Sequence, residues 1–110
     1  MIKDKRKNRL TDHLRDLAAK FLERESSRTA LITVTRAELS DNGKKMNLLI
    51  SVYPPERQDQ ALDFAKRKMG DLRNFVASEM KTKTVPIFSV NLDLGEKNRQ
   101  RMDELLASSR

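Results

Sequence analysis

The chain has 110 residues, enough for one domain with a thin core. Hydrophobic residues make up 37% of it and charged residues 35%, so most charged side chains must lie on the surface. Lys and Arg number 23 against 16 Asp and Glu, which gives a net charge of +7. This excess attracts polyanions, and nucleic acid, an anionic membrane and an acidic protein would all fit.

Residue types alone exclude several classes of site. Without cysteine there can be neither a disulfide scaffold nor a thiolate zinc site, and a single histidine, His13, excludes a multi-histidine metal site. The sequence shows no nucleophile paired with a base and no glycine-rich phosphate loop. We therefore expect no enzyme, no metal and no cofactor.

No targeting or membrane segment is visible. No apolar run approaches the roughly 20 residues needed to cross a bilayer. The charged stretch 1–9 is not followed by the apolar segment of a secretory signal. We expect no membrane partner and a cytoplasmic protein, with an organelle as the alternative if a transit peptide has been removed.

The first half of the sequence predicts a helix and a hairpin. Residues 5–24 carry apolar side chains at spacings of four, three and four, namely Leu10, Leu14, Leu17 and Phe21. Residues 29–39 are rich in β-branched side chains, and residues 45–53 mostly alternate between apolar and polar. Between them, Asp41-Asn42-Gly43 predicts a turn, because Asn and Gly tolerate positive φ.

The second half predicts an interrupted helix, a third strand and a short last helix. A helix is expected to begin near Glu56, and its apolar stripe extends from Leu62 to Met80 with Gly70 inside it. Glycine costs roughly 0.5–1 kcal/mol relative to alanine in a helix interior, so we expect a break within a residue or two of Gly70. A strand then begins at Val85-Pro86 and ends near Asp93. The last, polar helix carries Met102, Leu105 and Leu106.

The resulting order is αββααβα, which predicts a single α+β domain over residues 1–110. The third strand follows a helical crossover, so it can join the hairpin parallel to one neighbour. We expect a three-stranded mixed sheet with helices on one face and a kinked helix pair near Gly70. This is the element order of a type II KH domain.

Three stretches of the sequence resemble the ribosome-binding factor A family. They are residues 34–41, residues 69–76, and the spaced pattern Val85-Pro86, Asp93, Arg101-Met102 and Leu105-Leu106. Their order over a chain of this length carries the resemblance. The family usually has Ala-x-Gly at the helix kink, and here the triplet is Lys68-Met69-Gly70, so lysine replaces alanine.

The resemblance implies a non-enzymatic, KH-like assembly factor. It implies binding to free, immature small ribosomal subunits and their ribosomal RNA, and support of late rRNA processing and subunit maturation, especially in the cold. We expect a monomer. The alternative from charge alone is a basic adaptor that docks acidic proteins without RNA. A salt titration separates the two, because RNA binding through several phosphates weakens linearly in log salt.

Two groups of basic residues are the candidate RNA contacts. The first surrounds the expected break, where a glycine permits close approach and a helix N-terminus favours phosphate; it consists of Lys66, Arg67, Lys68, Gly70, Arg73, Lys81 and Lys83. The second is the N-terminal run of Lys3, Lys5, Arg6, Lys7 and Arg9, which could lie along phosphates. For both groups the alternative is a solvated charge run with no partner.

The aromatic side chains give little sign of base stacking. They make up 5% of the chain, and no aromatic pair of the RRM type occurs. We expect Tyr53 and Phe88 to pack in the core or at a sheet edge. Recognition is then expected through the RNA backbone and shape.

Overall fold

A computed structural model describes residues 4–26, 29–80 and 84–95, with the side chains of residues 4 and 5 left out. The elements are α1 (Asp4–Glu25), β1 (Leu31–Leu39), β2 (Lys45–Tyr53), a 3-10 turn η1 (Pro55–Arg57), α2 (Gln58–Arg67), α3 (Met69–Glu79) and β3 (Ile87–Leu92). This confirms the predicted order αββααβ. The last predicted helix, with Met102, Leu105 and Leu106, lies outside the described residues.

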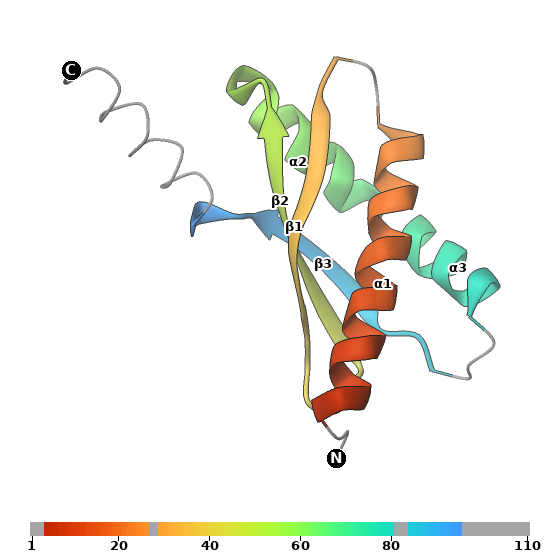
Figure 1. Cartoon of the computed structure of the whole chain (residues 1–110). Coiled ribbons are helices and arrows are strands. Elements are labelled where there is room, and N and C mark those ends of the chain that lie inside the picture. Colours follow the sequence, from red (N-terminus) through yellow and green to blue (C-terminus); the bar gives the residue numbers. More distant parts are fainter. Residues whose placement is uncertain (1–3, 27–28, 81–83, 96–110) are drawn as a thin grey trace.

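The strands form one three-stranded mixed sheet in the order β1-β2-β3. β2 is central, pairing antiparallel with β1 and parallel with β3 (Figure 1). The α2–α3 pair supplies the crossover that a parallel connection needs. The segment from Ile87 to Leu92 therefore joins the hairpin sheet, as predicted.

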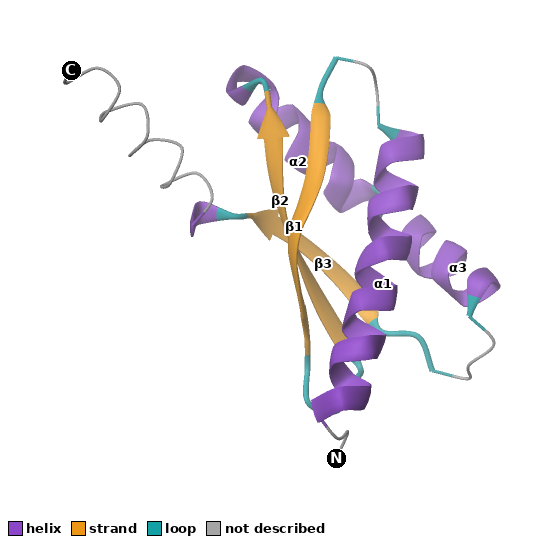
Figure 2. Cartoon of the chain, in the orientation of Figure 1, coloured by secondary structure: helices purple, strands orange, loops and turns teal. Residues whose placement is uncertain are grey.

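All three helices cover the same face of the sheet (Figure 2). α1 lies along β1, and α2 and α3 pack over β3. The apolar side chains of β2 that point toward the helices, Met46, Leu48 and Ile50, are at most 1% exposed. They meet the stripes that the helical spacing predicted, with Leu14, Leu22, Leu72 and Val76 fully buried. Burial of these side chains is the main source of stability for the domain.

The opposite face of the sheet carries polar side chains and no helix among the described elements. Asn47 Oδ1 accepts hydrogen bonds from Asn91 Nδ2 at 2.8 Å and Ser89 Oγ at 3.1 Å. The β1–β2 register shifts between Val34 and Arg36, leaving Thr35 as a bulge. The Thr35 hydroxyl reaches the carboxylate of Asp93 beyond the end of β3, so this contact spans the sheet on its open side.

The hairpin turn follows the sequence prediction. Gly43 has φ of 71°, the conformation for which glycine is favoured. Asn42 Oδ1 accepts from the Lys44 backbone N–H at 3.0 Å, and the Ser40 carbonyl accepts from Gly43 N–H at 2.9 Å. Across the described ranges, no helix is both long enough and apolar enough to span a membrane.

Candidate nucleic-acid interface

The long helical stripe breaks at a single residue, Lys68. Its backbone N–H bonds to the carbonyls of Phe64 and Ala65, and its own carbonyl accepts from Leu72 N–H at 2.8 Å. Lys68 therefore ends α2 and begins α3, with φ of −92° and ψ of −1°. The break lies two residues before Gly70, which confirms the predicted interruption.

Gly70 itself does not create the break. It lies in the first turn of α3, it is exposed, and a Cβ built on it would meet no atom within 4 Å. Its φ is not positive, in contrast to that of Gly43. The interpretation that the glycine causes the kink is therefore wrong, because alanine would fit the same backbone. Because glycine has no side chain, the backbone of α3 is exposed at this position beside the break.

We expect Gly70→Ala to stabilise the fold by roughly 0.5–1 kcal/mol, because alanine loses less backbone entropy in a helix. The melting temperature should rise by roughly 2–8 °C, followed by circular dichroism. The control is Gly43→Ala, which should lower the melting temperature, because Gly43 has positive φ. A lower melting temperature for Gly70→Ala would show that the backbone at this position demands glycine.

The basic side chains near the break are of two kinds, those that make contacts within the fold and those that do not. Lys66 and Arg67 are exposed at the end of α2, and neither forms an ion pair with an acidic group in the described part of the chain. Lys68 is half-buried, with Nζ 3.8 Å from Asp71 Oδ2 and 5.7 Å from the centre of the Phe64 ring. Arg73 donates from Nη2 to the Val85 carbonyl at 3.2 Å. Lys66 and Arg67 are thus available to a ligand, whereas Lys68 and Arg73 also have structural contacts.

The remaining candidates near the break, Lys81 and Lys83, lie outside the described residues. The first turn of α3 has no side-chain cap within the described ranges. α3 begins directly after Lys66, Arg67 and Lys68, so the positive end of its peptide dipoles lies next to these cations along the chain. This arrangement favours an anion at the break, and contact with RNA there stays a prediction.

The N-terminal basic group is divided by the structure. Arg6 and Arg9 are exposed on the first turns of α1. Lys7 Nζ lies 2.8 Å from Asp41 Oδ1 in the hairpin turn, and this bond and charge lower the pKa of Asp41. The Lys7–Asp41 ion pair therefore links α1 to the hairpin turn and makes Lys7 less available to RNA. Lys3 lies outside the described residues, as does the side chain of Lys5.

The two basic groups lie toward opposite ends of α1. Arg9 is near the start of α1. At the other end of the helix, Glu25 lines the same pocket as Phe64, and the Lys68 ammonium lies over the Phe64 ring. Arg9 and Glu25 are separated by 16 helical residues, about 24 Å at 1.5 Å each. Lys66, Arg67 and Lys68 are thus consecutive at the break and Arg73 follows on α3, whereas the described N-terminal group lies at the other end of α1.

The two aromatic candidates differ in outcome. Phe88 is 5% exposed and belongs to the core, as expected. Tyr53 is 71% exposed, so the expectation of core or edge packing is wrong for it. It is the last residue of the central strand, on the face that the three helices leave uncovered, and its β1 partner Leu31 is 62% exposed.

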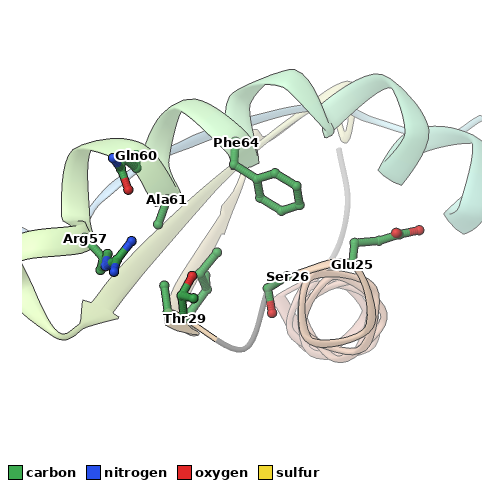
Figure 3. A pocket seen from close by; sticks show the side chains of 9 residues that line it. Glu25, Ser26, Thr29, Arg57, Gln60, Ala61 and Phe64 are labelled. Atoms are coloured by element: carbon green, nitrogen blue, oxygen red, sulfur yellow. The ribbon is translucent and has the colours of Figure 1, made fainter.

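A pocket of about 200 Å³ lies between the end of α1, the start of β1 and one side of α2 (Figure 3). Ala30, Ile32 and Ala61 are its apolar lining, and Phe64 closes one side. Polar groups come from Arg57 and Gln60 and from Ser26 and Thr29. This site was not predicted from the sequence. Its one signal was the spacing of Arg57, Gln60 and Phe64 on a single helix face.

Comparison with known proteins places this fold in a family. The family model for ribosome-binding factor A matches residues 6–106. Ribosome-binding factor A of Thermomicrobium roseum is 29% identical over 92% of this chain and 81% of that protein. Its counterpart in Thermodesulfovibrio yellowstonii is 30% identical over 93% of this chain and 88% of that protein. The chain belongs to the ribosome-binding factor A family.

Solved structures of ribosome-binding factor A share the fold. The crystal structure from Thermus thermophilus superposes with a TM-score of 0.68 at 19% identity, covering 77% of this chain and 93% of that one. The solution structure of a putative ribosome binding factor A from Thermotoga maritima gives 0.65 at 19% identity, covering 76% and 83%. The KH-like expectation is thereby confirmed. The family match contains both the break and the described N-terminal side chains Arg6 and Arg9.

Proposed function

We propose that this protein binds the immature small ribosomal subunit through its ribosomal RNA and supports late rRNA processing and maturation. The family match over residues 6–106 carries the proposal. A homology model of Thermus thermophilus ribosome binding factor A has been fitted into a cryo-EM map of its complex with 30S. That model superposes on this chain with a TM-score of 0.67. In this proposal the protein is a cytoplasmic monomer that acts without catalysis, and its role matters most in the cold.

The charge distribution supports RNA as the contacted component. A net charge of +7 attracts a polyanion at long range. Lys66 and Arg67 present two neighbouring cations just before the start of α3. Phosphates fit such a surface, because cations and backbone N–H groups both favour anionic oxygens. The break is therefore the proposed main contact with RNA.

Sedimentation of tagged protein with cell lysate tests the proposal. We expect the protein to migrate with free small subunits and to be depleted from large subunits and complete ribosomes. Affinity for purified small subunits should fall linearly in log salt, because phosphate contacts release counterions. Protein that stays at the top of the gradient would contradict the proposal. Protein that instead co-purifies with acidic proteins after RNase treatment would favour the adaptor function.

A further inference from the structure

The pocket beside α2 is small and is lined by both apolar and polar side chains. Its volume of about 200 Å³ lies below the roughly 300–1,000 Å³ of pockets for drug-sized molecules, so it suits one small ring system. Phe64 is half-buried at its wall, packed against the hydrophobic core. A half-buried ring is held in place by the core and still offers part of its surface to a ligand. Such a ring is a stacking partner for a base.

The polar groups of the pocket suit the edge of a nucleobase. Arg57 of η1 and Gln60 and Phe64 of α2 all line the pocket (Figure 3). The amide of Gln60 can both donate and accept hydrogen bonds, and the guanidinium of Arg57 donates. Neither side chain forms a hydrogen bond or ion pair with another group in the part of the chain that the structure describes. Both are exposed, so a ligand can reach them.

The pocket interior does not suit a phosphate as its occupant. Its lining combines one cation, Arg57, with one carboxylate, Glu25, and its floor is apolar. An anion there would lose hydration without a net positive charge to offset the loss. A neutral base keeps its own phosphate outside, where cations are present. Lys68 supplies one of them, with its ammonium 5.7 Å from the Phe64 ring centre.

We propose that this pocket binds one unstacked nucleobase of single-stranded ribosomal RNA whose phosphates lie along the helix break. The inference rests on the proposed function and adds base contact to it. Phe64 stacks on the base, Gln60 and Arg57 bond to its edge, and Lys66 and Arg67 hold the backbone. One base is thereby recognised in addition to the phosphates.

Binding of matched nine-nucleotide RNAs tests the pocket. One probe is oligoadenylate, and the other has the same sugar–phosphate chain with every base removed, so the two carry equal charge. We expect the full-length protein to bind oligoadenylate roughly tenfold more tightly, within the range for stacking of one base on an aromatic ring. Equal binding of the two probes would overturn the inference.

Variants then locate the base. Phe64→Leu keeps an apolar side chain but removes the ring, and Gln60→Ala removes the amide, so each should reduce the preference for oligoadenylate at least threefold. The matched controls are Phe75→Leu, on α3 and half-buried, and Gln58→Ala, on α2 outside the pocket lining; both should keep the preference. If Phe64→Leu and Gln60→Ala also keep it, the base binds elsewhere and the inference is wrong. Sedimentation with small subunits stays a separate readout, so failure of the pocket can be told from failure of the proposed function.

Discussion

Replacing Lys66 and Arg67 together with alanine should weaken binding to small subunits by roughly tenfold to sixtyfold at 0.1 M salt. The upper value follows from counterion release, which makes each phosphate contact worth roughly eightfold at that salt concentration. The slope of log affinity against log salt should become shallower by about two. Lys68 and Arg73 are left unchanged, because Lys68 contacts Asp71 and Phe64 and Arg73 bonds to Val85. Binding is measured by co-sedimentation across a salt series.

The matched control for this variant is Lys44→Ala with Lys45→Ala. Both lysines are exposed at the start of β2, beside the hairpin turn, and their removal changes the net charge by the same amount. We expect a clearly smaller loss for this pair. Circular dichroism must show both variants folded, since cations at the end of α2 also favour its dipole by about 0.3–1 kcal/mol each. Equal losses would mean that binding follows net charge and that the break is not the RNA site.

Leu48→Ala should destabilise the protein by roughly 2–5 kcal/mol, as large-to-small changes do in a packed core. Leu48 is fully buried in the central strand, opposite Ala37 of β1 and Val90 of β3. The total free energy of unfolding of a typical domain is only about 5–15 kcal/mol, so this loss is a large fraction of the stability. The melting temperature should fall by at least roughly 10 °C. Chemical and thermal unfolding provide the measurement.

The neighbouring Leu49→Ala serves as the control. Leu49 points to the open face of the same strand and is half-buried, so its truncation leaves no enclosed cavity. We expect it to cost less than about half as much as Leu48→Ala. A larger loss for Leu49 would mean that the open face is covered in solution and that the helices do not supply the only core.

Local patterns in the sequence were enough to specify the elements and most of the core. The spacing of Leu14, Leu17 and Phe21 identified the inner face of α1, and the alternation of Met46, Leu48 and Ile50 identified that of β2. These predictions were confirmed because each depends on the repeat of one helix or strand, which is readable within that segment. The hairpin turn was confirmed for the same reason, since positive φ at Gly43 is a property of a single residue.

Packing in three dimensions established how side chains from distant segments meet. The sequence placed Lys7 among the RNA contacts, yet its ammonium bonds to Asp41, 34 positions away. It placed the break correctly within two residues of Gly70 but attributed it to the glycine, whereas the turn forms at Lys68 and no neighbouring atom requires a glycine. The pocket combines α1, β1 and α2, three segments that no local pattern connects. Such features depend on contacts between elements. A single sequence indicates that each apolar face must be buried, but it does not say which element buries it.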